Sequence, residues 1–260
     1  MRIVRYQIDK NEEPIFGWES EGRVGPLSAS PLGVYRRLEL EYDLKQVHLL
    51  APIHPGKIIA IGRNYPLHAK EQSVEIPEIP IIFLKPLSTV IGPGEAIQLP
   101  PQSQQVEHEV ELVVVIGKGG RWIRAQQALQ HVLGYTIAND VTARDLQQRD
   151  NQWTRSKGFD TFCPLGPAIE TELDISDVLI TCRVNGEMRQ MSSTKEMVFS
   201  VPQLIAFISS IMTLDAGDII LTGTPSGVGV ISDGDVLESE IEGIGVLRNA
   251  VTSQSSIPPP

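Results

Sequence analysis

Residues 106–117 constrain the fold more than any other stretch, because they join two carboxylates to an uninterrupted apolar run. Residues 112–116 read LVVVI, a pattern typical of a strand buried on both faces, and Gly117 follows where such a strand would end. Glu109 and Glu111 are two apart, so a strand projects both side chains from one face. Two ionised carboxylates entering a buried strand repel each other unless a cation neutralises them or one stays protonated.

A hard divalent metal ion is the simplest such cation, but this stretch also has a plainer interpretation. The acidic residues beside His108 could form the solvated end of a strand. Glu107 and Glu109 are moreover a second pair with the same spacing as Glu109 and Glu111. The stretch alone therefore leaves open both metal binding and the register of the pair.

Asp140 adds a third carboxylate, at a predicted junction between a strand and a helix. Thr142 followed by Asp145 has the spacing of a capping box and predicts that the helix starts there. Arg144 and Gln147 then lie at i+4 and i+7 from Asp140, on one helical face. Three carboxylates without a matching set of Cys or His ligands favour Mg²⁺ or Mn²⁺, with Ca²⁺ as an alternative, over zinc or copper.

A candidate acid–base pair lies earlier in the chain. A short buried strand is predicted over residues 57–61, with a helical turn after Pro66. His68 and Glu71 are neighbours on such a helix. A carboxylate beside an imidazole orients the ring and raises its basicity, which suits a base that activates water. An exposed His and Glu on a polar surface helix is the alternative interpretation.

Four motifs together resemble the fumarylacetoacetate hydrolase (FAH) superfamily: the glutamate pair before LVVVIG, ANDVTARDLQ, WTRSKGFDTFCPLGP and LTGTPSGVG. They occur in the expected order over roughly residues 55–252. The segment GRNYPLHAKE resembles the acylpyruvate hydrolase and oxaloacetate decarboxylase branch. The resemblance implies that Glu109, Glu111 and Asp140 are the metal ligands.

The resemblance also implies roles for other residues. His68 and Glu71 match a water-activating pair on a lid, and Lys157 matches a lysine that stabilises negative charge on an enolate, an effect that is largest where water is excluded. In the glycine-rich loop over residues 222–229, TGTPSGVG, Thr224 adds a hydroxyl donor. The implied substrate-binding residues are Arg63, Gln147 and Thr224.

The resemblance implies an enzyme that acts on small 2-oxo (β-diketo) acids. The expected reaction is metal-dependent C–C hydrolysis of acylpyruvates, decarboxylation of oxaloacetate, or both, through a metal-bound enolate. One alternative is an oxaloacetate keto–enol tautomerase or dienoate isomerase of the same superfamily. Another is a noncatalytic metal- or metabolite-binding protein.

Charge and composition limit the partners. A net charge of −10 and the absence of a long basic stripe argue against a nucleic-acid partner. The most apolar windows are short and interrupted, which predicts no membrane span. With only Cys163 and Cys182, and a start without an apolar signal core, we expect a reduced, cytoplasmic protein. The expected partner is a small 2-oxo acid, and a homodimer is implied by the resemblance alone.

The chain has 260 residues, of which 41% are hydrophobic, enough for one large core and a small appended unit. We expect a small N-terminal β unit over residues 1–52, an FAH-type catalytic domain over 53–252 and a disordered tail over 253–260. The expected fold class is α+β and β-rich: an FAH-type mixed β-sheet roll or barrel with few helices.

Several local signals add detail. Asn185-Gly186 predicts a β-hairpin, and Ser200 with Pro202 predicts a helix that runs to about Ile211. Lys85, at the end of a predicted strand, either contacts the site or lies on the surface. The polar loop over residues 72–80 either closes over the site or is an inert connector.

Overall fold

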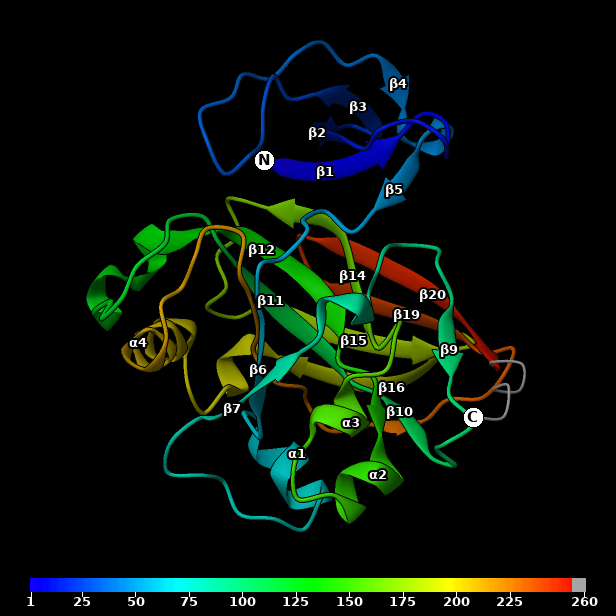
Figure 1. Cartoon of the computed structure of the whole chain (residues 1–260), viewed down its shortest axis with the longest axis vertical. Coiled ribbons are helices and arrows are strands. Elements are labelled where there is room, and N and C mark those ends of the chain that lie inside the picture. Colours follow the sequence, from blue (N-terminus) through cyan, green and yellow to red (C-terminus); the bar gives the residue numbers. More distant parts are fainter. Residues whose placement is uncertain (254–260) are drawn as a thin grey trace.

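A strand that is buried along its whole length forms the centre of the protein (Figure 1). The computed structural model describes residues 1–253, so the predicted tail lies outside the described residues except for Ser253. The central strand, β11 (Val110–Ile116), pairs antiparallel with β12 (Val132–Asn139) and β17 (Ile219–Leu221). Alternate side chains of β11 pack into two separate hydrophobic clusters, so neither face of the strand carries polar residues after Glu111.

The stretch over residues 106–117 forms two strands that are divided at Glu109. The backbone N–H of Glu109 donates to Asn139 Oδ1 at 2.8 Å, so it takes no part in the ladder. The preceding segment, β10 (Val106–His108), leaves the main sheet and pairs with β13 (Thr142–Ala143) and β18 (Gly229–Val230). Glu109 therefore lies at a bend between two sheets.

The main sheet has twelve strands and is mixed. β6 (Ile58–Gly62) pairs parallel with β17 and antiparallel with β7 (Ile81–Lys85), which is the last strand at that edge. On the other side β12 pairs with β14 (Cys163–Glu170), and the short β8 (Val90–Ile91) pairs parallel with β14.

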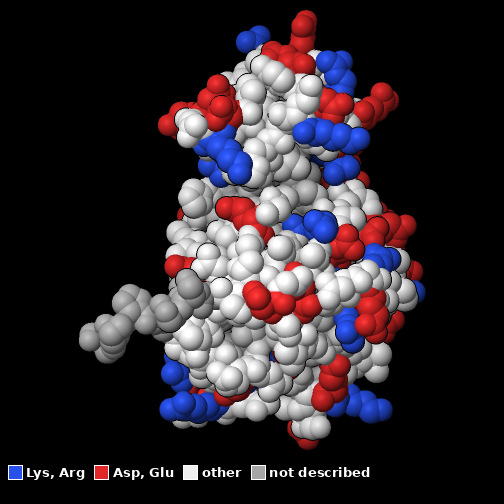
Figure 2. Space-filling view, turned by 90° about the vertical axis from the view of Figure 1, so that its right-hand side faces the viewer, with Lys and Arg blue, Asp and Glu red and all other residues white. Residues whose placement is uncertain are grey.

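The N-terminal residues form five short strands at the top of Figure 1. Their sheet is continuous with the main one, because Arg2 and Ile3 pair with Glu170 and Ile169 of β14. Figure 2 shows acidic and basic side chains mixed over this unit on the face in view. The five strands are β1 (Arg2–Gln7), β2 (Ile15–Ser20), β3 (Arg23–Pro26), β4 (Tyr42–Asp43) and β5 (His48–Leu50).

A second sheet of five strands packs near the site. The predicted hairpin is confirmed: Asn185 and Gly186 have φ values of 53° and 79°, as a type I′ turn requires. The sheet order is β16 (Glu187–Ser193), β15 (Leu179–Val184), β19 (Val236–Ile241), β20 (Gly245–Ser253) and β9 (Ile97–Leu99).

Helices are few and short, which confirms the β-rich fold class. The predicted helix from Ser200 is confirmed as α4 (Val201–Ile211), with a capping box between Ser200 and Gln203. No helix within residues 1–253 is long and apolar enough to cross a membrane. The other helices are α1 (Pro66–Glu71), α2 (Arg144–Arg149), α3 (Thr154–Lys157) and the 3₁₀ turns η1 (Leu44–Gln46), η2 (Leu87–Thr89), η3 (Ala125–His131) and η4 (Thr194–Glu196).

The capping box predicted at Thr142 and Asp145 is wrong. The Thr142 hydroxyl donates to the carbonyl of Asp140, and Asp145 accepts from Ser103 and Gln104. Helix α2 begins only at Arg144, after the short strand β13, so Asp140 is not on its face. The local pattern failed because the Thr142 hydroxyl bonds back to a carbonyl two residues before it, while residues distant in sequence take the Asp145 carboxylate.

Candidate active site

The three carboxylates singled out by the sequence meet in the structure. Glu109, Glu111 and Asp140 are 4%, 1% and 1% exposed, and each offers an oxygen that lies within 4.8 Å of the others. Glu109 lies at the bend before β11, Glu111 lies on β11, and Asp140 follows β12. The pairing of β11 with β12 therefore brings the three together.

Two buried lysines neutralise part of this charge. Lys157 Nζ, from α3, donates to Glu109 Oε2 at 2.7 Å and to Asp140 Oδ2 at 2.6 Å. Lys85 Nζ, at the end of β7, donates to Asp140 Oδ1 at 2.6 Å and to the carbonyl of Lys157 at 2.5 Å. Lys85 is 3% exposed, so the surface interpretation of this lysine is wrong.

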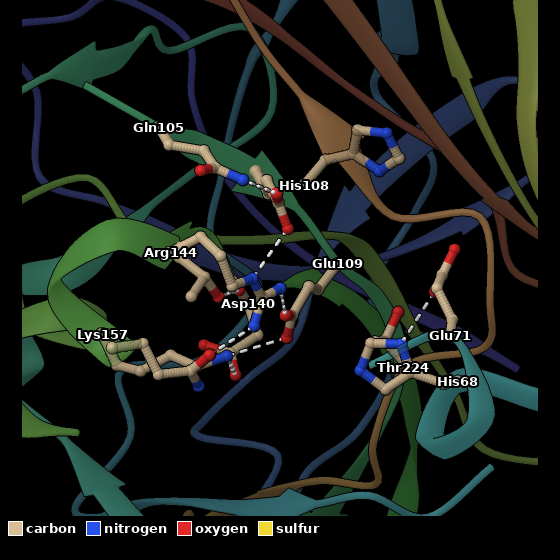
Figure 3. A network of polar contacts seen from close by, with 12 residues as sticks. His68, Glu71, Gln105, His108, Glu109, Asp140, Arg144, Lys157 and Thr224 are labelled. Atoms are coloured by element: carbon tan, nitrogen blue, oxygen red, sulfur yellow. Dashed lines mark hydrogen bonds and ion pairs between the residues drawn. The ribbon is translucent and has the colours of Figure 1, made fainter. Parts of the chain in front are cut away.

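Arg144 connects the second glutamate pair of the sequence (Figure 3). Its guanidinium contacts Glu109 and Gln147, and its Nε lies 2.7 Å from Glu107 Oε2. The other Glu107 oxygen accepts from Gln105 at 2.7 Å. Glu107 therefore contacts the guanidinium, while Glu109 contacts it and also belongs to the carboxylate cluster. This cluster consists of Glu109, Glu111 and Asp140.

The surroundings of the carboxylates differ in charge. Burial alone would raise the pKa of Glu109, but Lys157 and then Arg144 hold this pKa well below its usual value. Burial, and then Asp140 and Glu109, raise the pKa of Glu111 well above its usual value. Among the described residues, the hydrogen-bond partner of the Glu111 carboxylate is the backbone N–H of Gly223 at 2.6 Å.

The residues present fit a hard divalent cation. Four buried carboxylates face three buried cationic side chains. Within residues 1–253, Glu111 is the carboxylate of these four that forms no ion pair, so its negative charge is the least neutralised. An all-oxygen ligand set of this kind suits Mg²⁺, Mn²⁺ or Ca²⁺. The carboxylates are Glu107, Glu109, Glu111 and Asp140, and the cations are Lys85, Arg144 and Lys157.

The structure also brings His68 and Glu71 together on α1 (Figure 3). His68 Nδ1 lies 3.2 Å from Glu71 Oε2, and the other Glu71 oxygen accepts from the backbone N–H of Gly227 at 3.0 Å. His68 is 7% exposed, so it is not the surface histidine of the alternative interpretation. Glu71 lies closer to solvent and ties α1 to the glycine-rich loop.

These groups surround one cavity of about 220 Å³. This volume is smaller than the roughly 300–1,000 Å³ of pockets for drug-sized ligands, so it suits a small acid. Gln72 and Val74 line it, which brings the loop over residues 72–80 to the site. Of the predicted site residues, eight line the cavity and Glu71 does not: Arg63, His68, Glu109, Glu111, Asp140, Gln147, Lys157 and Thr224.

Sequence analysis missed the apolar wall of this cavity. The rings of Phe83 and Trp153 meet edge to face at 5.2 Å, and both line the cavity together with Ile61. Trp153 belongs to the same motif as Lys157, but no local pattern indicates that its indole lines a cavity. Cys163 is buried in the core, and burial raises the pKa of its thiol to about 12, which agrees with a packing role.

Comparison with known families agrees with this architecture. Residues 57–252 match the family described as fumarylacetoacetate (FAA) hydrolase, C-terminal. Residues 1–52 match the family described as Rv2993c-like, N-terminal. The chain belongs to the fumarylacetoacetate hydrolase family.

Some of the similar proteins and solved structures are named as tautomerases, isomerases or hydrolases. The chain is 50% identical over 219 residues to a mitochondrial oxaloacetate tautomerase of Homo sapiens, covering 79% of this chain and 70% of the relative. It is 44% identical over 286 residues to one from Rattus norvegicus, covering 96% and 91%. The structure of a 5-carboxymethyl-2-hydroxymuconate delta-isomerase from Mycobacterium smegmatis matches with a TM-score of 0.90 at 43% identity, covering 98% of this chain and 100% of that one.

Proposed function

We propose that this protein is a divalent-metal-dependent tautomerase of small 2-oxo dicarboxylic acids such as oxaloacetate. The observation that carries the proposal is the lining of the cavity of about 220 Å³. It combines the carboxylate cluster, a buried lysine, a histidine and a separate arginine. Relatives named oxaloacetate tautomerase, at 44–50% identity, support the same reaction.

Arg63 supports a substrate with two carboxylates. It lines the cavity, and within residues 1–253 no carboxylate forms an ion pair with it. Its φ of 62° lies in the left-handed region, which is costly for a side chain other than glycine and recurs at functional sites. A guanidinium without an internal partner suits bidentate binding of a distal carboxylate.

The cavity residues can supply the charge and proton chemistry of tautomerisation. A Mg²⁺ or Mn²⁺ ion held by Glu109, Glu111 and Asp140 would act as a Lewis acid toward the 2-oxo group. The Lys157 ammonium is fixed by two carboxylates and compensates negative charge that develops on the substrate oxygen. The wall of Phe83 and Trp153 excludes water from this side.

His68 is the proposed proton carrier. Because Glu71 accepts from Nδ1, the tautomer with its proton on Nδ1 leaves Nε2 free to accept a proton. In the forward direction Nε2 takes a proton from C3 of the keto acid, and the imidazolium returns a proton to the 2-oxo oxygen to give the enol. The reverse steps regenerate the keto acid.

Hydrolysis of acylpyruvates, with decarboxylation of oxaloacetate, is the second candidate. The observation that favours it is the same His68–Glu71 pair, since an imidazole oriented by a carboxylate can also activate water. Both candidates need the carboxylate cluster and Lys157. Hydrolysis differs from tautomerisation because water attacks a second carbonyl, whereas decarboxylation differs from it because CO₂ leaves from C3 without attack by water.

Arg63→Met is expected to raise the KM for oxaloacetate by about 10–100-fold with little change in kcat, because a charged hydrogen-bonded pair contributes about 1.5–3 kcal/mol. Steady-state kinetics with saturating Mg²⁺ measure both constants. Arg248→Met, which changes an exposed arginine on β20, is the matched control. An unchanged KM would remove the argument for a dicarboxylic substrate.

His68→Ala is expected to lower kcat for tautomerisation by about 10²–10⁴-fold, the usual contribution of a positioned acid–base group. His54→Ala, at an exposed position, is the control and is expected to be unaffected. The variant is assayed with both oxaloacetate and acetylpyruvate. Loss of acetylpyruvate cleavage with full tautomerase activity would instead assign His68 to water activation and favour the second candidate.

A further inference from the structure

A buried glutamine outside the cavity connects the two halves of the site. Gln190, on β16, is fully buried, and both the oxygen and the nitrogen of its side-chain amide form hydrogen bonds. Its Nε2 lies 2.8 Å from both Thr224 Oγ1 and the carbonyl of Pro225. Its Oε1 lies 2.9 Å from His108 Nδ1 and 3.1 Å from the backbone N of Val110.

Two of these partners fix the orientation of the amide. The carbonyl of Pro225 can only accept, and the backbone N–H of Val110 can only donate. Nε2 must therefore face the glycine-rich loop, and Oε1 must face the strand that carries the glutamates. His108 then donates from Nδ1 to the same oxygen. The glutamine holds the loop and the strand at one fixed separation.

This arrangement also fixes the hydroxyl proton of Thr224. Because Thr224 Oγ1 accepts from Gln190, its own proton points to the carbonyl of Val110, at 2.8 Å. The hydroxyl donor expected of Thr224 is therefore already used within the protein. What Oγ1 keeps for a ligand in the cavity is an acceptor lone pair.

The same strand supports the loop further along. Gly227 has a φ of +96°, and a Cβ there would lie 2.0 Å from the carbonyl oxygen of Arg189, next to Gln190. The N–H of Gly227 in turn holds Glu71, the partner of His68. The loop from Thr224 to Gly227 therefore packs directly against β16.

We propose that Gln190 is a positioning residue, which sets Thr224 and the glycine-rich loop against the carboxylate strand in the geometry that binds substrate. The proposal rests on the proposed function only in that the cavity binds a small 2-oxo acid. Gln190 does not line the cavity, so its effect must pass through Thr224 and the loop.

A double-mutant cycle on the full chain with Mg²⁺ tests this proposal. Gln190→Met keeps the approximate volume and removes all four hydrogen bonds, and Thr224→Val removes the hydroxyl. Calorimetry gives the Kd of oxalate, a planar dicarboxylate that needs no turnover, and kinetics give KM and kcat for oxaloacetate. Oxalate has no donor for Thr224 Oγ1, so both variants act by freeing the glycine-rich loop from the strand. Each single variant is expected to weaken oxalate binding about tenfold and to raise KM more than it lowers kcat.

The double variant is expected to bind oxalate no more weakly than the weaker single variant, because the two residues act as one unit. Losses that multiply in the double variant, or an unchanged Kd in folded Gln190→Met, would overturn the proposal. If Gln190→Met does not fold, Gln190→Glu keeps the acceptor facing Val110 and gives up donors to the loop. The same weakening of oxalate is expected of it, and wild-type affinity there would equally overturn the proposal.

Met191→Ala is the matched control, because Met191 is the next residue on β16 and is 59% exposed. It is expected to leave the Kd of oxalate unchanged. Binding separates this proposal from the proposed function. A wild type that binds oxalate but does not tautomerise oxaloacetate contradicts the function, while the cycle still decides whether Gln190 positions the site.

Discussion

Lys157→Met is expected to lower kcat for oxaloacetate by about 10²–10³-fold, while the protein binds Mg²⁺ at least as tightly as wild type. The ammonium lies within 2.7 Å of Glu109 and within 2.6 Å of Asp140, so it competes with a metal ion for the same oxygens and repels it. Removing it helps metal binding. It harms the reaction, because methionine supplies no positive charge beside the developing negative charge.

The same variant has an expected effect on stability. Burial lowers the pKa of Lys157, but Asp140 and Glu109 raise it above its usual value, so the lysine is charged in the folded protein. Without added metal, the free energy of unfolding is expected to fall by about 3–5 kcal/mol, since breaking a buried ion pair leaves charges uncompensated. Added Mg²⁺ is expected to restore much of this loss.

Calorimetric titration with Mg²⁺, thermal unfolding with and without the metal, and steady-state kinetics check these three results. Lys195→Met is the matched control, because Lys195 forms an exposed pair with Asp177. A Lys157→Met protein with normal kcat would contradict the role of the ammonium in catalysis. Weaker Mg²⁺ binding would contradict the competition between lysine and metal.

Glu111→Gln is expected to abolish turnover and to weaken Mg²⁺ binding by at least about 100-fold, because it removes a charged ligand. The metal-free variant is nevertheless expected to be as stable as wild type or more so. Glutamine retains an oxygen for the N–H of Gly223 and removes the charge that Asp140 and Glu109 oppose. This combination distinguishes a ligand from a residue that merely supports the fold.

The pair of measurements for Glu111→Gln is metal affinity by calorimetry and the unfolding midpoint in chelator. Glu196→Gln, at an exposed position, is the control and is expected to match wild type in both. A variant that loses stability in chelator yet binds Mg²⁺ normally would place Glu111 in the core packing and outside the metal site.

Local patterns predicted the features that depend on neighbouring residues. The apolar run after Glu111 identified the central strand, and Asn185-Gly186 identified the hairpin, because period and turn chemistry are written in a few adjacent positions. The capping box at Thr142 and Asp145 failed, since Ser103, which is distant in sequence, takes the Asp145 carboxylate. The Thr142 hydroxyl bonds instead to the carbonyl two residues before it.

Partnerships across the chain could not be predicted from such patterns. Lys85 and Asp140 are 55 residues apart, and Gln190 and His108 are 82 apart. The sequence left Lys85 between site and surface and offered no signal at Gln190. Which polar side chain is buried against which is decided by how the sheets pack, and only the assembled fold contains that information.

The most direct test of the central claim is to dilute enol oxaloacetate from dry solvent into buffer with the protein and follow the loss of its ultraviolet absorbance. The account predicts fast conversion to the keto form with Mg²⁺ or Mn²⁺, no loss of total oxaloacetate, arrest by EDTA and recovery when the metal is restored. Conversion no faster than in buffer alone, together with cleavage of acetylpyruvate or release of CO₂ from oxaloacetate, would contradict it and identify a hydrolase or decarboxylase.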